Sequence, residues 1–221
     1  MVKRATKIGR PPAGEIEKRK LTILEVATKL FIAKGYDKTT LAEIGREAGV
    51  TKRTIYDHIG DKETLFRTIC LESLPHSLEL HFVPHADGKT ARESLRSLAK
   101  MILDYSLSDE NIGLTRMLIV ERQRIPDLVQ QAVLAMRELY RELIENALAD
   151  MVDHGLLAPC SKMDRIAYYF YDVIVGGVHT QMLFDIVTEP PSDAEIDQRI
   201  DLFLFGYKAL ETPRKRNRKS R

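Results

Sequence analysis

The sequence contains no tryptophan and only two cysteines, Cys70 and Cys160, among 221 residues. Neither cysteine belongs to a CxxC or Cys/His spacing, which excludes a disulfide framework and a cysteine-based zinc site. No apolar run approaches the roughly 18 residues of a membrane span, and the basic N-terminus has no apolar segment typical of a signal peptide. We therefore expect a cytoplasmic protein that has no membrane partner.

Strand patterns and catalytic motifs are also scarce. Alternating β-branched and polar residues are nearly absent, whereas apolar residues recur at helical spacing, so the predicted fold class is all-α. The sequence has no HExxH, GxSxG, Walker loop or Glu-x-x-His pair, and we expect neither an enzyme nor a cofactor. His76, His81 and His85 could bring two ligands to a metal, but Pro75 and Pro84 favour a loop there. A metal-dependent enzyme stays an alternative that elemental analysis would test.

Charge is distributed unevenly, although the formal net charge is only +2. Residues 1–67 hold 15 Lys and Arg against 9 Asp and Glu, whereas residues 68–213 hold 13 against 23. Residues 214–221 add six basic side chains and no acidic one. This segregation indicates that the basic N-terminal part meets a polyanion, while the acidic body has another task.

Helix signals are dense near the N-terminus. A first helix is predicted over about 15–33, and Gly35 follows it as a C-terminal glycine should. A second is predicted over 41–48, with Thr40 as its N-cap and Glu43 completing an S/T-x-x-E capping box. These signals place a short, well-defined helix directly after a longer one.

A third helix is predicted over about 52–59, after a three-residue turn that contains Gly49. Two helices of about eight residues joined in this way form a helix-turn-helix motif. Gly45 is small where the third helix must pass close to the second, and Gly49 can adopt a positive φ in the turn. A further helix begins near Asp61 and runs to about residue 74.

The third predicted helix would enter the DNA major groove while the second crosses the backbone. Its cationic residues suit phosphates or the acceptor edge of guanine, its threonine suits a thymine methyl, and its tyrosine and histidine can donate to phosphates. The free backbone N–H groups at the N-terminal ends of helices near the groove favour further phosphate contacts. The candidates from this reasoning are Thr40, Lys52, Arg53, Thr54, Tyr56, His58 and Lys62.

The segment TTLAEIGREAGVTKRTIYDHIGDKETLF, residues 39–66, resembles the DNA-binding domain of the TetR family of bacterial transcriptional regulators. The resemblance covers about residues 17–66 and includes the Tyr-x-His after the turn. Arg53 and Ile59 depart from the residues usual in the family, which are glycine or proline at the first position and phenylalanine at the second. The positions that the resemblance implies to face DNA are Thr40, Thr51, Lys52, Thr54, Tyr56, His58 and Lys62.

Two basic arms flank the helical part. Gly9-Arg10-Pro11 is similar to the core of an AT-hook, in which an extended arginine lies in the narrow minor groove of A·T-rich DNA, so Arg10 is a further DNA-binding candidate. A disordered basic leader is the alternative. For residues 214–221 we expect a disordered tail that adds non-specific affinity for anions.

The acidic body is also expected to be helical. Its predicted helices cover about 90–107, 113–124, 126–154, 162–187 and 193–211. The last two are apolar on more sides than a surface helix tolerates, which favours a dimer face. Gly176 and Gly177 would allow close helix approach there, and Phe203, Phe205 and Tyr207 would add aromatic area. Burial in the core of a single chain is the competing explanation.

The family resemblance implies that the acidic body binds a small-molecule effector and forms the dimer. Such a pocket is lined by apolar side chains with a few polar groups, and the aromatic and methionine content suits a hydrophobic or aromatic compound. For each candidate, a role in the core or on the surface is the alternative. The candidate lining residues are Tyr105, Met117, Glu121, Tyr140, Tyr169, Asp172 and His179.

The predicted organisation has four parts: a basic arm (1–16), a helix-turn-helix domain (17–77), a helical effector-binding and dimerisation domain (78–212) and a basic disordered tail (213–221). We expect a transcriptional repressor that binds a palindromic operator on double-stranded DNA as a homodimer and is released by a small-molecule effector. The alternative is a ligand-independent architectural DNA-binding protein whose basic arms supply most of the affinity.

Overall fold

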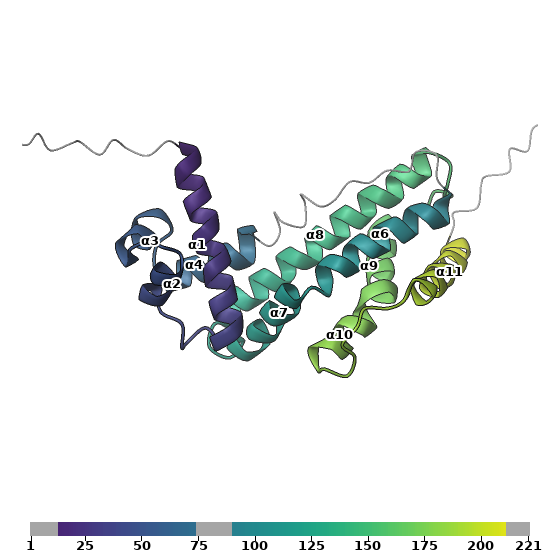
Figure 1. The fold of residues 1–221 in the computed structure, drawn as a ribbon. Helices are drawn as coiled ribbons and strands as arrows, with labels where there is room; N and C mark the ends of the chain where they lie inside the picture. The colour runs from purple at the N-terminus through teal and green to yellow at the C-terminus, as the bar shows by residue number, and fades with distance from the viewer. Residues whose placement is uncertain (1–12, 74–89, 211–221) are drawn as a thin grey trace, which may run out of the picture. The chain divides into compact units, whose positions relative to one another are not determined.

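Helices form the regular secondary structure of the protein over the residues that the structure, a computed structural model, describes: 13–73 and 90–210 (Figure 1). The all-α fold class predicted from the sequence is therefore confirmed. The chain divides into two units, Met1–Ser73 and Leu74–Arg221. Within the described ranges, no helix is long and apolar enough to cross a membrane.

The N-terminal unit consists of one long helix followed by short ones. Its elements are α1 (Ala13–Lys34), α2 (Leu41–Glu47), α3 (Lys52–His58), α4 (Lys62–Thr68) and a π-helical segment, η1 (Ile69–Ser73). The ring centroids of Phe31 and Phe66 lie 5.6 Å apart, and that of Tyr36 lies 5.4 and 5.0 Å from them. This buried aromatic cluster holds α1 to α4. Gly35, with φ of +84°, ends α1 as predicted.

The C-terminal unit is a bundle of helices of unequal length. Its elements are α6 (Ala91–Ser106), α7 (Asp109–Glu121), α8 (Pro126–Asp153), α9 (Met163–Tyr171), a π-helical segment η2 (Asp172–Gly176), α10 (Gly177–Leu183) and α11 (Asp193–Leu210). α8 packs against α9 and α6, and α11 packs against α6 and α9. Ile102, Ile144, Phe170 and Ile200 are fully buried in the core that these helices share.

The chain from α9 to α10 is helical throughout, with η2 in its middle. A π-helical turn displaces backbone carbonyl groups from their usual donors. The Arg199 guanidinium, from α11, donates to the carbonyl oxygen of Ile174 at 2.6 Å and to that of Val173 at 3.5 Å. Arg199 therefore supplies hydrogen-bond donors to carbonyl groups of the π-helical turn and connects α11 to that turn.

Two helix boundaries differ from the prediction by four residues each. α7 begins at Asp109 rather than near residue 113, because Ser108 caps it by accepting a hydrogen bond from the backbone N–H of Asn111 at 3.2 Å. α10 ends at Leu183 rather than near residue 187, because Asp185 adopts a left-handed φ of +55°. A single polar side chain or a single residue with positive φ decided each boundary, and the apolar periodicity does not reveal either one.

The C-terminal end of α10 is held by a side chain from α7. Arg116 donates to the carbonyl oxygens of Met182 at 2.6 Å and Leu183 at 3.0 Å, and to the Asp185 carboxylate at 2.6 Å. The last carbonyl groups of a helix have no donor within the helix itself. Arg116 supplies those donors and fixes the direction in which the chain leaves α10.

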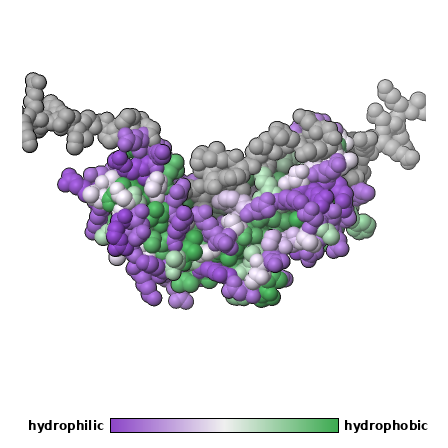
Figure 2. Space-filling view, viewed as in Figure 1, coloured by the Kyte–Doolittle hydropathy of each residue, from purple (hydrophilic) through white to green (hydrophobic). Residues whose placement is uncertain are grey.

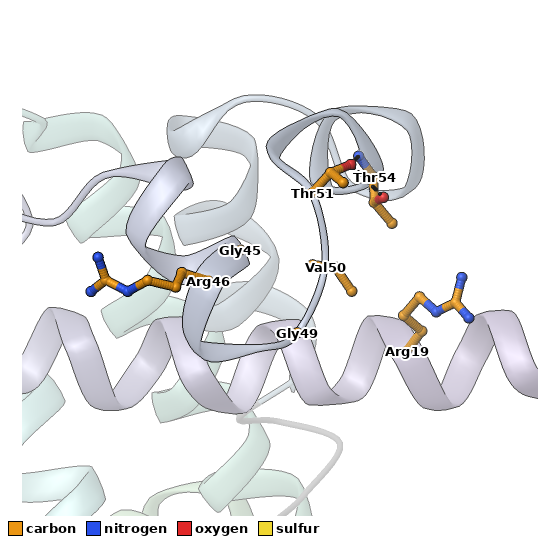
Figure 3. A pocket seen from close by; sticks show the side chains of 7 residues that line it. All are labelled: Arg19, Gly45, Arg46, Gly49, Val50, Thr51 and Thr54. Atoms are coloured by element: carbon orange, nitrogen blue, oxygen red, sulfur yellow. Dashed lines mark hydrogen bonds between the residues drawn. The ribbon is translucent and has the colours of Figure 1, made fainter.

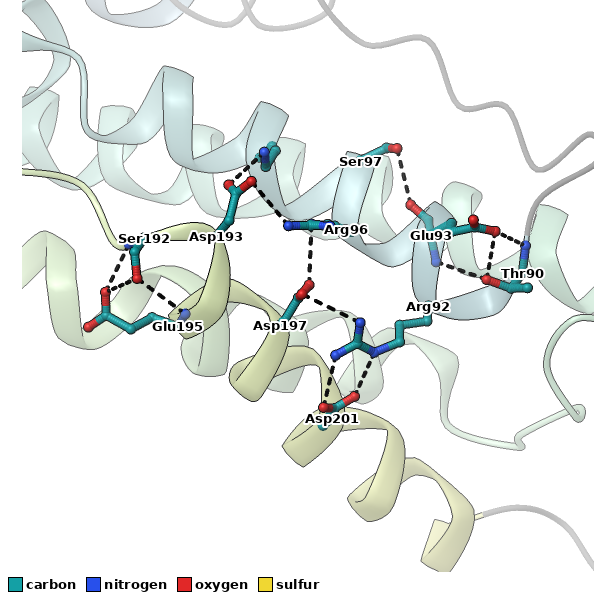
Figure 4. Close-up of polar contacts among 11 residues, drawn as sticks. Thr90, Arg92, Glu93, Arg96, Ser97, Ser192, Asp193, Glu195, Asp197 and Asp201 are labelled. Carbon is teal, nitrogen blue, oxygen red and sulfur yellow. Dashed lines mark hydrogen bonds and ion pairs between the residues drawn. The ribbon is translucent and has the colours of Figure 1, made fainter.

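Opposite charges join α6 to α11 in an array that we call the α6–α11 ion ladder (Figure 4). Its members are Arg92, Arg96 and Lys100 on α6 and Asp193, Asp197 and Asp201 on α11. Arg92 binds Asp201 through two parallel hydrogen bonds of 2.8 and 3.0 Å. Because both helices repeat their charges every four residues, each charged side chain meets a partner across the interface.

Apolar side chains interrupt the hydrophilic surface in the view of Figure 2. In the C-terminal unit, the large apolar side chains that are exposed include Ile119, Val120, Val133, Leu134, Tyr169, Phe184, Ile186, Leu202, Phe205 and Leu210. The last five all come after the C-terminal end of α10 in the sequence. Exposed apolar groups that form a contiguous patch mark an interaction surface more often than single exposed residues do.

The ion ladder predicts an acid-dependent loss of stability. Lys100 holds the pKa of Asp193, and Arg92 that of Asp201, below the usual range of a carboxyl. A carboxyl whose pKa is lowered by folding stabilises the protein above its unfolded pKa of about 3.9, and this contribution is lost as the pH falls through the folded value. Asp201→Asn should therefore lower the Tm at pH 7 by roughly 1–3 °C, because exposed ion pairs contribute little each.

Thermal unfolding of the two proteins, followed by circular dichroism, measures this effect. The Tm difference should shrink below about pH 4 and in about 1 M salt, where the pair is neutralised or screened. Asp104→Asn is the matched control, because Asp104 is exposed on α6 outside the ladder. A difference that persists at low pH, or an equal one in the control, would contradict the assignment.

Candidate nucleic-acid interface

The short helices of the N-terminal unit each begin at a capping side chain. Thr40, Thr51 and Asp61 precede α2, α3 and α4, and each accepts a hydrogen bond from the backbone N–H three residues later, at 3.2, 3.1 and 2.8 Å. The N-cap predicted at Thr40 is confirmed. The Lys34 ammonium contacts the Glu43 carboxylate and, with the Thr40 backbone N–H, lowers the pKa of that carboxyl. These caps fix where each helix begins.

The turn between α2 and α3 leaves no room for a side chain at Gly45. The backbone N–H of Val50 donates to the carbonyl oxygen of Gly45 at 2.8 Å. A Cβ atom added to Gly45 would lie 2.8 Å from the carbonyl oxygen of Val50. Gly49 has a φ of +67°, which glycine adopts without strain. The roles predicted for both glycines are confirmed, and the crossing of α2 and α3 depends on them.

α3 presents opposite faces to the core and to the exterior. Ile55 is fully buried, as is Ile44 of α2, the helix that packs against α3. Lys52, Arg53 and Tyr56 are exposed on the same helix. One apolar side chain thus anchors a short helix whose outward face carries two cations and a phenol. This is the arrangement by which a helix-turn-helix motif offers one helix to the major groove.

The predicted DNA-contact residues lie on α3 and at the N-terminal ends of α2, α3 and α4. The exposed ones are Thr40, Thr51, Lys52, Arg53 and Tyr56, and the half-buried ones are Thr54, His58 and Lys62. Arg10 and the basic segment 214–221 lie outside the described residues. Their contacts with DNA therefore stay predictions.

Side chains on α3 hold one another in place. The hydroxyl groups of Thr51 and Thr54 lie 2.9 Å apart, while Thr51 also accepts from the backbone N–H of Thr54. The Lys52 ammonium lies 5.5 Å from the ring centroid of Tyr56, within the range of a cation–π contact. The polar groups of α3 are thus partly preorganised before any ligand arrives.

Two cations have partners that the sequence did not indicate. Arg53 Nε lies 3.6 Å from Asp57 Oδ2, one turn further along α3, in an exposed pair of little energetic weight. Lys62 donates to the carbonyl oxygen of Asp37 at 3.2 Å, and its ammonium lies 4.3 Å from the ring centroid of Tyr36. Lys62 therefore also joins the start of α4 to the segment that precedes α2.

A recess of about 520 Å³ opens beside the start of α3 (Figure 3). It is lined by Arg19, Gly45, Arg46, Gly49, Val50, Thr51 and Thr54. In Figure 3 the Arg19 side chain rises from α1 on the side of Thr54, whereas Arg46 points away from the recess. Reasoning from the sequence missed Arg19, because no local signal shows that α1 passes close to the start of α3.

In the C-terminal unit, two predicted effector residues lie in a cluster of hydroxyl groups. The Tyr140 hydroxyl lies 2.8 Å from Ser106 Oγ, and the ring centroids of Tyr140 and Tyr171 are 4.7 Å apart. Burial raises the pKa of Tyr105 and Tyr140, and it raises the pKa of Tyr171 to about 12. These phenols are therefore neutral at physiological pH. Tyr171 was not among the predicted residues, although it follows Tyr169 closely in the sequence.

The other predicted effector residues lie on α7, α9, η2 and α10. Met117 and Glu121 are buried on α7. His179 is half-buried on α10, and burial lowers the pKa of its imidazole. Tyr169 and Asp172 are exposed. The structure thus groups Tyr105 and Tyr140, and the charge of Asp172 contributes to the raised pKa of Tyr171 beside them.

The aromatic residues of α11 divide between the core and the surface. Phe203 and Tyr207 are 5% and 2% exposed, and Tyr207 donates to the carbonyl oxygen of Ala158 at 2.6 Å. For these two residues the competing explanation, burial within one chain, is correct. Phe205 is 79% exposed. Among the described residues, a Cβ atom on Gly177 would meet no heavy atom within 4 Å outside its own helical backbone and chain neighbours, so Gly177 mediates no close approach between these residues.

Among residues 13–73 and 90–210, no three His, Cys, Asp or Glu side chains are grouped so that they could hold a metal ion. His76, His81 and His85 lie outside the described residues, so the expectation that they hold no metal stays a prediction. Burial raises the pKa of the Cys70 thiol to about 12, which leaves it protonated and unreactive.

The chain matches two protein-family models. Residues 23–69 match the model described as "Bacterial regulatory proteins, tetR family". Residues 93–209, more than half of the chain, match the model described as "AefR-like transcriptional repressor, C-terminal domain". The first match contains the helix-turn-helix, and the second spans almost all of the described C-terminal unit.

Similar proteins include named transcriptional regulators. The HTH-type transcriptional regulator SrpR of Pseudomonas putida is 27% identical over 209 residues, which cover 94% of this chain and 92% of SrpR. A structure from Mesorhizobium loti, titled a putative TetR-family transcriptional regulator, superposes with a TM-score of 0.74 at 23% identity, covering 88% of this chain and 96% of that one. The flavonoid-responsive regulator FrrA superposes with a TM-score of 0.71 at 20% identity, covering 90% and 100%. These structural likenesses show the shared fold.

The turn at Gly45 predicts a specific loss of function. Gly45→Ala would place a Cβ atom against the backbone oxygen of Val50, so α2 and α3 must move apart. We expect the N-terminal unit to lose roughly 1–3 kcal/mol of stability, as for other overpacked sites, and DNA binding to fall with it. Urea unfolding and fluorescence anisotropy with a labelled duplex measure the two effects.

Gly177→Ala is the matched control for this substitution. It adds the same methyl group to a helical glycine with open space around it. The control should leave the stability of the N-terminal unit unchanged. If Gly45→Ala behaved like the control in both measurements, the close approach would not constrain the motif.

Proposed function

This chain belongs to the TetR family of bacterial transcriptional regulators, and we propose that it is a homodimeric repressor that binds a palindromic operator and is released by a small-molecule effector. Membership of the family makes it a DNA-binding transcriptional regulator. The observation that carries the finer proposal is the anchored α3, whose outward face bears cations and hydrogen-bond donors. We further propose that the protein acts in the cytoplasm, without catalysis and without a cofactor.

The proposed interface divides contacts by their chemistry. Lys52, Arg53 and Tyr56 are exposed and suit phosphate oxygens, which position the protein without specifying sequence. Thr54, whose hydroxyl is held by Thr51, suits a base edge or a thymine methyl. His58 and Thr40 complete the phosphate contacts.

A homodimer follows from the size of the motif and from the exposed apolar face. A single α3 contacts only a few base pairs, and a symmetric dimer on a palindrome multiplies affinity and specificity. Leu202 and Phe205 on α11 are 63% and 79% exposed, and Phe184 and Ile186 after α10 are each 70% exposed. We assign these side chains to the dimer interface, which would remove them from water.

Effector binding is proposed for the C-terminal unit. The hydroxyl cluster around Tyr140 is buried and uncharged, which suits a hydrophobic or aromatic compound that carries a hydrogen-bonding group. Met117, Glu121 and His179 are further candidates. Tyr169 and Asp172 would contact an effector only from the surface. Binding would favour a dimer geometry in which the two α3 helices no longer match successive major grooves.

The first test of this function is selection from random-sequence duplex DNA at physiological salt with the full-length protein. We expect enrichment of a palindrome. Tyr56→Ala should then weaken binding to all sequences by roughly tenfold, whereas Thr54→Ala should change the base preference at one position of each half-site by about 1–3 kcal/mol.

Two outcomes would contradict the proposal. Equal losses on operator and random DNA for both variants would show that α3 specifies no sequence. Enrichment for A·T content alone would favour the architectural alternative, in which the basic arms dominate. A selected palindrome also supplies the probe for an effector screen, which should include aromatic hydroxyl compounds and, because FrrA is named for its response to them, flavonoids.

The dimer interface has its own prediction. Phe205→Glu would place a carboxylate among apolar side chains, at a cost of several kcal/mol unless it finds a partner. Sedimentation analysis should show a dimer for the wild type and mostly monomer for the variant at about micromolar concentration. Ile119→Glu is the control, because Ile119 is 56% exposed on α7 outside the proposed interface. Dissociation of the control, or an intact Phe205→Glu dimer, would refute the assignment.

A further inference from the structure

The recess beside α3 brings a cation from α1 to the edge of the candidate nucleic-acid interface. Its wall includes Thr51, the N-cap of α3, and Thr54 on α3, together with Arg19 from α1 (Figure 3). Val50 and Gly49, from the α2–α3 turn, also line it. The recess therefore combines a guanidinium, two hydroxyl groups and backbone in one concave surface.

The Arg19 side chain is only loosely held. It is 36% exposed and contacts Glu15, one turn earlier on α1, at 3.5 Å. An exposed i,i+4 ion pair contributes little to stability, so another anion can replace the carboxylate at little cost. A phosphate suits this exchange, because a guanidinium forms two parallel hydrogen bonds to its oxygens.

We propose that Arg19 binds a phosphate of the DNA backbone at the edge of the major groove that α3 enters, so that the interface extends from the helix-turn-helix to α1. The inference rests on DNA binding through α3. When α3 lies in the groove, its first residues face one sugar–phosphate backbone, and the recess that adjoins Thr51 and Thr54 faces the same backbone. Glu15 then acts as an internal competitor that occupies Arg19 in the absence of DNA.

Salt dependence of binding tests the charge contact. Each phosphate neutralised by a cation contributes about 0.9 to the slope of log affinity against log salt. With the full-length protein and its selected duplex, Arg19→Ala should reduce this slope by about one per bound protomer and weaken binding roughly tenfold on operator and random DNA alike. Arg19→Lys should keep most of the slope and lose part of the affinity.

Lys29→Ala is the matched control for charge. Lys29 is exposed on the same helix, and ten residues separate it from Arg19, which corresponds to about 15 Å along the helix axis. Its removal lowers the net charge equally and should change the slope much less. An Arg19→Ala slope equal to that of Lys29→Ala would overturn the proposal, and unchanged thermal melting would show that the fold is intact.

A double-mutant cycle tests the competition with Glu15. Glu15→Gln should raise DNA affinity by roughly twofold to fivefold in the wild type, because it frees Arg19, and should have less effect in the Arg19→Ala background. Glu17→Gln, which removes another exposed carboxylate of α1, should raise affinity less and independently of Arg19. Additive effects of Glu15→Gln and Arg19→Ala would mean that Glu15 only repels DNA at long range, and would overturn the competitor role.

Failure of the proposed DNA-binding function and failure of the proposed Arg19 contact give different experimental results. If the wild-type protein binds no duplex DNA, the proposed function fails before Arg19 is considered. If the wild type binds its operator and Arg19→Ala matches its control, only the α1 contact is lost, and the interface ends at α2 and α3.

Discussion

The close approach of α2 and α3 at Gly45 is the constraint on which the N-terminal unit depends. The backbone of Val50 occupies the place where any other residue at position 45 would carry its Cβ atom. α2 and α3 pack together, Ile44 and Ile55 are both fully buried, and Lys52, Arg53 and Tyr56 of α3 are exposed. The backbone contact between Gly45 and Val50 thus sets the direction in which the cationic face of α3 points. The same polar residues on a helix that crossed α2 at another angle would not match a groove of DNA.

Charged side chains have different roles in the two units. In the C-terminal unit the cations of α6 are engaged by the aspartates of α11, so that the acidic body uses part of its charge to join two of its own helices. In the N-terminal unit the cations of α3 have weak or local partners, such as the exposed Asp57 that pairs with Arg53. Exposed, weakly paired cations can exchange their counterions for phosphates, which is the main source of affinity for nucleic acid.

The C-terminal unit has an apolar surface that its own fold does not cover. Phe203 and Tyr207 complete the core from one side of α11, while Leu202 and Phe205 extend from its other side. Arg116 and Arg199 fix the neighbouring helix ends and the π-helical turn by donating to backbone carbonyl groups. A surface held by such specific contacts presents its apolar groups in one arrangement, which is what a symmetric partner requires in the proposed dimer.

The sequence alone determined the features that depend on a few neighbouring residues: the all-α class, the helix-turn-helix, the cap at Thr40 and the roles of Gly45 and Gly49. These follow from local backbone chemistry, which acts within one or two helical turns. Tertiary structure decided the rest. The end of α10 depends on Asp185 and on Arg116 from another helix, and the inward or outward direction of Phe203 and Phe205 depends on which elements pack beside α11. The contact of Lys62 with Tyr36 and the position of Arg19 beside α3 join residues that are more than 20 positions apart. Apolar periodicity specifies that a helix has a buried face, but the neighbouring elements decide which side chains that face meets.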